Sequence, residues 1–399
     1  MQQGHKSSSS ALSERNPGID ALRGVAILFV ILNHVGIRVP LAKTAIATLI
    51  PAWLLQRLNY NGYEAVFIFF VISGFLIARR SQQRWGEPRN MPLRDFYLLR
   101  AARILPTLLL VVALLSLFHL LGVANFVIHN KGQSLAGAIA SALGLYLNFY
   151  EGITGYLPGG WDVLWSLSIE ELFYLAFPLV CLTLGRTPRL LMLALALLAL
   201  SLPLTRSAIV DNEIWLEKAY LPGMSAIAIG VLTAMLAARI PPPSRMIAAS
   251  LCAIGVIGVG GVLFASRFVW QWLHDGSVLM LALSAAVLVL GLHWQAASKQ
   301  AWRWRGLGWL CSCGRLSYEI YLFHMFCVFG VLAAAKASGL ATDYGFVWYV
   351  PAIFFSWLLG LAIARGFSEP IERRLRHAFR RPPAATVSTR ISSRDRLLH

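Results

Sequence analysis

The sequence predicts an all-α, polytopic membrane protein: a bundle of about ten transmembrane helices, with an additional re-entrant or interfacial segment and both termini in the cytoplasm. Of the 399 residues, 57% are hydrophobic and only 13% are charged. Apolar stretches long enough to cross a bilayer recur from about residue 20 to about residue 365. This combination is typical of a polytopic membrane protein and not of a soluble enzyme with a large core.

Ten apolar segments account for the expected transmembrane helices, since about 20 such residues cross the hydrocarbon layer. In chain order they are roughly residues 19–38, 62–79, 104–122, 163–184, 189–205, 221–239, 246–265, 277–294, 314–335 and 347–365. An eleventh segment, residues 136–150 (AGAIASALGLYLNFY), is weaker. We expect it to be re-entrant or interfacial.

The basic residues set the expected orientation, because cytoplasmic loops carry an excess of lysine and arginine. If the N-terminus is cytoplasmic and segment 136–150 does not cross, the basic stretches at 79–103, 299–315 and 373–396 all face the cytoplasm. The acidic stretch 211–217 then faces outward. Counting 136–150 as a span would reverse this bias. One exception remains, because the first outer loop carries Arg38, Lys43 and Arg57.

The net charge of +17 does not indicate a nucleic-acid partner, because the basic residues lie between apolar segments and in the C-terminal tail. We also expect no metal site. The five cysteines have neither disulfide-framework nor zinc-type spacing; they are Cys181, Cys252, Cys311, Cys313 and Cys327.

Three regions are expected along the chain. Residues 1–16 are polar and serine-rich, which predicts disorder. Residues 17–375 form the membrane domain, and residues 376–399 form a basic cytoplasmic tail near anionic lipid. The first apolar segment is expected to stay as a helix and not to be a cleaved signal, because Arg23 and His34 interrupt it and no small-residue cleavage site follows.

The first span carries both an arginine and a histidine, in LRGVAILFVILNH. Arg23 and His34 are eleven residues apart, which in a helix is three turns plus about 20°, so they share a face about 16 Å apart along the axis. With the N-terminus inside, Arg23 lies near the cytoplasmic surface, where it can snorkel, and His34 lies in the outer half. An ionisable group at that depth marks a pathway or a site, although a bond to a neighbouring helix is the alternative.

Two arginines precede the third span, in FYLLRAARILP. Arg100 and Arg103 are one turn apart on a common face and on the same side of the membrane as Arg23. The positive-inside bias explains such residues, and a guanidinium cluster that binds phosphates is the alternative. Both interpretations stay open.

The fourth span places two adjacent carboxylates in the membrane, in WSLSIEELFY. Glu170 and Glu171 each cost about 2.5–3.5 kcal/mol there. Their side chains point about 100° apart, so one can face a cavity while the other pairs elsewhere. Tyr174 lies one turn beyond Glu170. We expect Glu170 to fix the tautomer of His34 and to raise its basicity.

The ninth span begins with GRLSYEIYLFH, which forms a polar stripe. Ser317, Tyr321 and His324 follow at i, i+4 and i+7, with Arg315 at the cytoplasmic end. Hydrogen bonds between helices and a catalytic role explain the stripe equally well. In the second span, the pair Ser73-Gly74 by itself favours close helix packing.

Taken in order, these motifs resemble acyltransferase family 3, the integral-membrane O-acyltransferases of bacterial cell envelopes. The resemblance covers roughly residues 17–375. It rests on the Arg23–His34 pair, FFVISGFLI, RAARILP, WSLSIEELFY and GRLSYEIYLFH. The pair alone is a weak signal, whereas the ordered set is a strong one.

The resemblance implies transfer of an acyl group, most simply acetyl, from cytoplasmic acetyl-CoA or another acyl-CoA to a hydroxyl of a glycan or lipid-linked saccharide outside the bacterial inner membrane. We expect no metal. The expected catalytic residues are His34, Glu170, Tyr174 and His324. The expected acyl-CoA-binding residues are Arg23, Ser73, Arg100, Arg103 and Arg315.

The chain departs from the family pattern at two places. Many members have an acidic residue six positions before the serine of FFVISG, where this chain has Phe67, with Glu64 one turn earlier as a possible substitute. Many also have Arg-x-Asp at the start of a later span, where this chain reads PGMSAIAIG. These departures concern the acceptor more than the core reaction.

Two other classes of membrane protein remain as alternatives. A transporter also uses intramembrane glutamate and histidine, as a proton or substrate relay. The absence of visible inverted repeats and the arginines in register on one side argue mildly against it. A non-catalytic scaffold would leave Glu170 unexplained.

Overall fold

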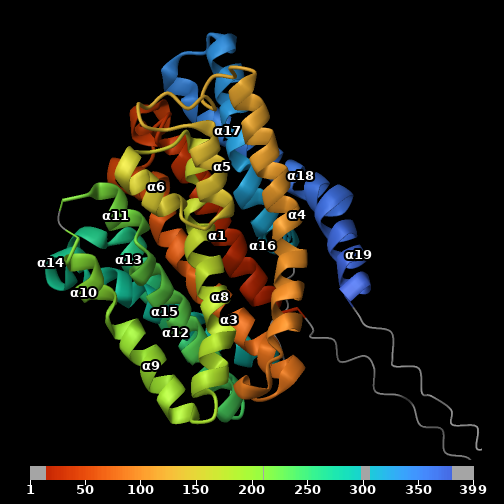
Figure 1. Cartoon of the computed structure of the whole chain (residues 1–399). Coiled ribbons are helices and arrows are strands. Elements are labelled where there is room, and N and C mark those ends of the chain that lie inside the picture. The colour runs from red at the N-terminus through yellow and green to blue at the C-terminus, as the bar shows by residue number, and fades with distance from the viewer. Residues whose placement is uncertain (1–14, 210, 298–305, 380–399) are drawn as a thin grey trace, which may run out of the picture.

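The structure is a computed structural model that describes residues 15–209, 211–297 and 306–379. Within these ranges the regular elements are all helical, and ten helices or helix pairs are long and apolar enough to cross a membrane. The predicted bundle of ten spans is therefore confirmed. Which end faces the cytoplasm stays a prediction. Figure 1 shows the long helices running roughly side by side.

The long helices are α1 (Pro17–Gly36), α3 (Gly62–Trp85), α4 (Leu93–Leu120), α8 (Trp165–Leu184), α9 (Pro188–Leu200), α12 (Tyr220–Arg239), α13 (Arg245–Phe264), α15 (Gly276–Ala297), α17 (Ser317–Ser338) and α18 (Tyr349–Ile363). The shorter ones are α2 (Ala52–Tyr60), α5 (Leu135–Leu143), α6 (Leu147–Thr154), α7 (Gly159–Asp162), α10 (Leu202–Ser207), α11 (Glu213–Lys218), α14 (Ser266–Leu273), α16 (Gly308–Arg315) and α19 (Glu369–Phe379). Short 3₁₀ segments are η1 (Leu41–Lys43), η2 (Ala45–Thr48), η3 (Pro88–Asn90) and η4 (Thr342–Trp348), and η5 (Ala364–Ser368) is a π-helical segment.

Segment 136–150 is not a span, as expected. It forms two short helices, α5 and α6, which are separated by a turn in which Leu145 has a φ of 61°. A non-glycine residue in the left-handed region interrupts a helix. Neither piece is long enough to cross a bilayer. Helix α6 packs against α8 and α11 at the end of the bundle that contains His34.

Two boundaries differ from the expected ones. Helix α4 starts at Leu93 and not near residue 104, because arginines lower the hydropathy of its first turns but are good helix formers. The chain continues from α18 through η5 into α19, so the expected boundary at residue 375 falls inside a helix. Figure 1 shows α19 beside the bundle, where it packs against α4. The expected disordered segment and basic tail lie mostly outside the described residues.

Glycines let α1 and α3 approach their neighbours at backbone distance. A Cβ atom built on Gly314 of α16 would lie 1.7 Å from the carbonyl oxygen of Asp20 in α1. A Cβ atom on Gly74 of α3 would lie 2.0 Å from the carbonyl oxygen of Ile227 in α12, and one on Gly230 would lie 2.0 Å from that of Val71. Small residues are what permit such contacts between membrane helices. The packing interpretation of Ser73-Gly74 is therefore confirmed at Gly74.

The variant Gly74→Val should destabilise the bundle, because its side chain would force α3 and α12 apart. Overpacking of this kind costs about 1–3 kcal/mol. The measurement is thermal denaturation of the purified protein in detergent. The matched control is Gly260→Ala, since a Cβ atom at Gly260 meets nothing within 4 Å. Equal melting temperatures for the two variants would contradict this account of the α3–α12 contact.

Candidate functional site

Two cavities lie along α1, one at each of its two ionisable groups. The first, which we call the Arg23 cavity, has a volume of about 470 Å³ and is lined by Arg23 of α1. The second, the His34 cavity, has a volume of about 620 Å³ and is lined by His34. No lining residue is common to both. One helix therefore contributes to two separate sites.

The Arg23 cavity is strongly basic. The structure brings together here all five expected acyl-CoA-binding residues, Arg23, Ser73, Arg100, Arg103 and Arg315, together with Glu170 and Tyr174. The other charged lining residues are Arg15, Arg80, Arg373, Arg376, Glu369 and Glu372. Eight arginines against three glutamates give an excess of positive charge that suits a polyanionic ligand.

Arg100 pairs with both glutamates of the fourth span. Its Nη2 atom lies 3.0 Å from Oε1 of Glu170, and its Nε atom lies 3.1 Å from each carboxylate oxygen of Glu171. The hydroxyl of Tyr174 donates to the same oxygen of Glu170 at 3.0 Å, and the ring of Tyr174 lies 3.9 Å from the guanidinium carbon of Arg100. This closed network joins α4 to α8.

The expected contact between Glu170 and His34 is not formed, and this corrects our interpretation of Glu170. In α8, Trp165 lines the His34 cavity, whereas Glu170, five residues further along, lines the Arg23 cavity. A helix rises about 1.5 Å per residue, so this step carries the carboxylate away from the histidine. Tyr174 lies with Glu170, away from His34.

The charge of Arg103 is also neutralised by carboxylates. Its guanidinium lies 3.0 Å from Glu372 of α19 and 3.8 Å from Glu319 of α17. By contrast, four lining arginines have no carboxylate within 4 Å among the residues that the structure describes; they are Arg15, Arg23, Arg80 and Arg315. Arg23 donates a hydrogen bond to the hydroxyl of Ser317 at 2.7 Å. These four arginines are the cations most available to an anionic ligand.

A second histidine, not a carboxylate, lies beside His34. The ring centroids of His34 and His324 are 5.0 Å apart, and the ring planes are inclined by 45°. Nδ1 of His324 lies 2.7 Å from the carbonyl oxygen of Tyr321, so this nitrogen carries the proton, because a carbonyl can only accept. The unprotonated Nε2 is buried without a partner in the described part of the chain. His324 is fully buried and does not line the cavity itself.

The sequence did not predict a buried ion cluster in the wall of the His34 cavity. Lys218 is almost fully buried and pairs with Glu151 at 2.9 Å and with Asp162. Burial and the neighbouring Asp162 raise the pKa of the Glu151 carboxyl well above its ordinary value, against the lowering effect of Lys218. These residues come from α6, α7 and α11. No local pattern links them, so only the structure shows that they meet.

Helix α17 faces both cavities, although Tyr321 is the one residue of its polar stripe that lines either of them. Tyr318 lines the Arg23 cavity and Tyr321 lines the His34 cavity. The hydroxyl of Tyr321 donates to the carbonyl oxygen of Val163 at 2.8 Å and accepts from the hydroxyl of Ser166 at 2.7 Å. Ser166 lies between Trp165 and Leu167, which line the two different cavities. The bond between Tyr321 and Ser166 therefore marks the boundary between them.

Glu64 does not replace the missing acidic residue of the family motif within these cavities. It lines neither of them, although its neighbour Tyr63 lines the His34 cavity. The hydroxyl of Tyr63 is held by Arg206, which pairs with Asp275 at 3.1 Å. Phe67 is buried against the rings of Tyr63 and Phe70.

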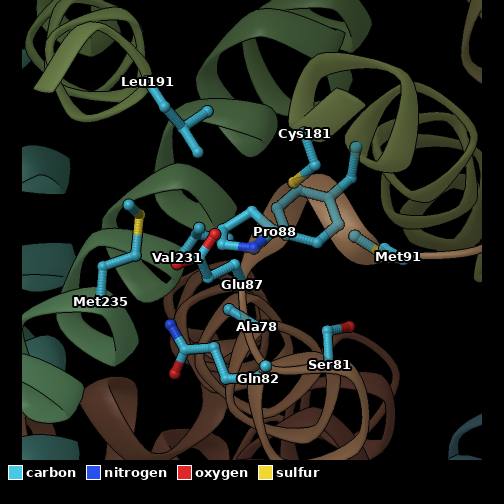
Figure 2. Close-up of a pocket in the computed structure, with 12 residues that line it drawn as sticks. Ala78, Ser81, Gln82, Glu87, Pro88, Met91, Cys181, Leu191, Val231 and Met235 are labelled. Atoms are coloured by element: carbon cyan, nitrogen blue, oxygen red, sulfur yellow. The ribbon is translucent and has the colours of Figure 1, made fainter. Parts of the chain in front are cut away.

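A third, apolar pocket lies away from this region (Figure 2). It is formed mainly by α3, η3, α8 and α12 and has a volume of about 20 Å³. Such a volume holds about one water molecule. Cys181 and Met235 lie in its wall, and Gln82 contributes an amide oxygen without a partner among the described residues. This volume is far below that of an ordinary ligand pocket.

Comparisons with known proteins point to the same family as the motifs do. A family model described as an acyltransferase domain matches residues 16–366. The peptidoglycan O-acetyltransferase OatA of Listeria monocytogenes is 24% identical over 333 residues, which cover 77% of this chain and 48% of that protein. The O-acetyltransferase OatA of Staphylococcus aureus is 26% identical over 334 residues, 77% of this chain and 50% of that protein. The chain thus spans about half the length of these relatives. No solved structure matches it.

The variant Arg100→Gln should lower the stability of the protein strongly, because it leaves Glu170 and Glu171 without their counter-charge. Breaking a buried pair in this way costs about 3–5 kcal/mol. Thermal denaturation in detergent measures the loss.

The control for this prediction is the triple variant R100Q/E170Q/E171Q, which removes all three charges together. It should recover most of the lost stability. If the single and triple variants melt at the same temperature, the ion pairs are not what Arg100 contributes to the fold.

Proposed function

Because this chain belongs to the family of acyltransferase domains whose model it matches over residues 16–366, we propose that it moves an acyl group from cytoplasmic acyl-CoA to a hydroxyl of a glycan on the other side of the membrane. Family membership makes it a membrane-embedded acyltransferase and favours acyl transfer over the alternative function of a transporter. The donor, the acceptor and the sidedness are part of the proposal. The bacterial inner membrane is the location it implies.

One observation carries the proposal: α1 contributes Arg23 to a basic cavity and His34 to a second cavity of balanced charge. Coenzyme A carries phosphates on its nucleotide end, and the arginines without carboxylate partners suit those phosphates. The thioester is at the other end of a long pantetheine arm. Its length is comparable to the roughly 16 Å between the two α1 residues. The nucleotide can therefore stay at the cytoplasmic end.

The arm has to pass the boundary at Tyr321 and Ser166, since the two cavities share no lining residue. At that boundary the hydroxyl of Ser166 donates a hydrogen bond to the hydroxyl of Tyr321. An ordinary hydrogen bond contributes about 0.5–1.5 kcal/mol net, so a bound ligand can readily displace it. We propose that the thioester enters the His34 cavity at this place.

His34 is the proposed reactive group, by one of two routes. As a general base, its imidazole takes the proton of the acceptor hydroxyl while the oxygen attacks the thioester carbonyl; the C–S bond breaks, and the coenzyme A sulfur leaves and is protonated. Alternatively, the imidazole attacks the carbonyl first, the C–S bond breaks and the coenzyme A sulfur leaves. The acceptor oxygen then attacks the acyl-histidine, the N–C bond breaks, and the hydroxyl proton passes to the released imidazole. His324 is a positioning residue in both routes, because it contacts His34 but does not line the cavity.

Acetyl is the simplest acyl group to propose, because both relatives above are named as O-acetyltransferases. A cell-wall glycan is the acceptor that the Listeria protein's name suggests. The formal charges that line the His34 cavity balance, with Arg38 and Lys218 against Asp162 and Glu217. An uncharged polyhydroxylated acceptor fits that balance.

Two variants should separate the roles of the two cavities in liposomes that contain labelled acetyl-CoA. His34→Ala should abolish acetyl transfer while coenzyme A still binds. Arg23→Ala should raise KM for acetyl-CoA about tenfold to a hundredfold, because a charge-assisted hydrogen bond contributes about 1.5–3 kcal/mol. Arg186→Ala, an exposed arginine on the same expected side of the membrane, is the matched control.

Full acetyl transfer by the His34→Ala protein would overturn the proposed chemistry. An unchanged KM in the Arg23→Ala protein would overturn the proposed phosphate site. Solute flux that needs no coenzyme A would support a transporter instead.

A further inference from the structure

A second hollow continues the His34 cavity at the same end of the bundle. It has a volume of about 270 Å³ and is formed by the loop between α4 and α5 together with the segment that follows α6. Four residues line both the hollow and the His34 cavity: Arg38, Tyr156, Leu157 and Gly159. A ligand that occupies the His34 cavity can therefore extend into the hollow without leaving the protein.

The loop is fixed in place by hydrogen bonds that leave ligand-binding groups free. The Nε2 atom of Gln133 donates to the carbonyl oxygen of Gly155 at 2.7 Å, and the Nδ2 atom of Asn130 donates to that of Tyr156 at 3.0 Å. The Oε1 atom of Gln133 is buried without a partner among the described residues. Gln133 itself lines the hollow, so an acceptor that lacks a donor lies next to the space that a ligand hydroxyl would occupy.

Two exposed side chains of the loop add further hydrogen-bonding capacity. Asn125 and His129 both line the hollow, and neither side chain has a hydrogen bond within the described ranges. Among the described residues that line the hollow, Arg38 is the one arginine, and there is no lysine, aspartate or glutamate. Arg38 donates to the carbonyl oxygen of His34 and lies over the ring of Phe329 at 4.7 Å. A neutral ligand rich in hydroxyls suits this lining better than an ionic one does.

An aromatic ring links the two spaces. Tyr156 lines both of them, and Lys218 lies 4.4 Å from its ring centre. The C–H face of a sugar packs against such a ring, while its hydroxyls bond to amides and imidazoles at the rim. The hollow therefore combines the two kinds of contact that a saccharide offers.

We propose that the hollow lined by Asn125, His129, Gln133 and Tyr156 is a second saccharide subsite, which holds the sugar next to the one that is acylated. It makes the protein prefer an acceptor chain of two or more sugars over a free monosaccharide. The inference rests on the proposed function, because it takes the His34 cavity as the place of transfer.

The test uses β-1,4-linked N-acetylglucosamine oligosaccharides of one, two and four units as probes. With the intact protein in liposomes and labelled acetyl-CoA, kcat/KM should rise about tenfold between one unit and two, the equivalent of two ordinary hydrogen bonds. In the variant N125G/H129A the gain should fall to within about twofold, while transfer to the single sugar stays unchanged. Glycine tolerates the positive φ of 69° at position 125. The matched control is Lys131→Ala, an exposed residue of the same loop that does not line the hollow.

A binding measurement separates this inference from the proposed reaction. Calorimetry with the His34→Ala protein should show tighter binding of the tetrasaccharide than of the monosaccharide, and adding N125G/H129A should remove the difference. Length-dependent binding without any transfer by the intact protein would support the subsite and overturn the reaction. Transfer or binding that is independent of length, no binding of any probe, or an equal effect of N125G/H129A on all lengths would overturn the subsite.

Discussion

The fixed rise of a single helix governs the arrangement of this protein. Because α1 advances about 1.5 Å per residue, the eleven residues between Arg23 and His34 set the separation of a basic cavity from a cavity that is balanced in charge. Glycine contacts hold this helix against α16 at backbone distance. In the proposed reaction, the phosphates of the donor lie in the first cavity and its thioester lies in the second, so the length of the donor matches the separation of the cavities.

Pairing with carboxylates determines which arginines of the Arg23 cavity are available to bind an anionic ligand. Arg100 and Arg103 have the sequence pattern of a phosphate site, but their partners are the carboxylates of α8, α17 and α19. Their main contribution is to hold four helices around the cavity. Arg23 has a serine hydroxyl as its partner and keeps its charge available. In a low-dielectric interior this difference is large, because a paired guanidinium has already lost most of its attraction for an added anion.

The positions of the spans could be predicted because hydropathy reports them directly. The polar ends of the spans could not be predicted in this way, because the arginines at the start of α4 lower its hydropathy as loop residues would.

The two adjacent glutamates predicted that a functional or paired carboxylate is present, but they did not predict its partner. The prediction for Glu170 was wrong because its side chain differs from Trp165, which lines the His34 cavity, both in depth along α8 and in direction around that helix. His324 was a candidate from its spacing, yet only the fold shows that its ring lies against that of His34. The Lys218 cluster had no local signal, since Lys218 lies 56 residues from Asp162 and 67 residues from Glu151 in sequence.

The most direct test is an electron cryomicroscopy structure of the His34→Ala protein with a non-hydrolysable acetyl-CoA analogue. The account predicts that the phosphates lie within hydrogen-bonding distance of Arg23 and its neighbours in the basic cavity. It also predicts that the arm passes between Tyr321 and Ser166, and that the acyl carbonyl lies beside residue 34. Phosphates bound at the histidine end, or an arm that stays outside the boundary between the cavities, would contradict it.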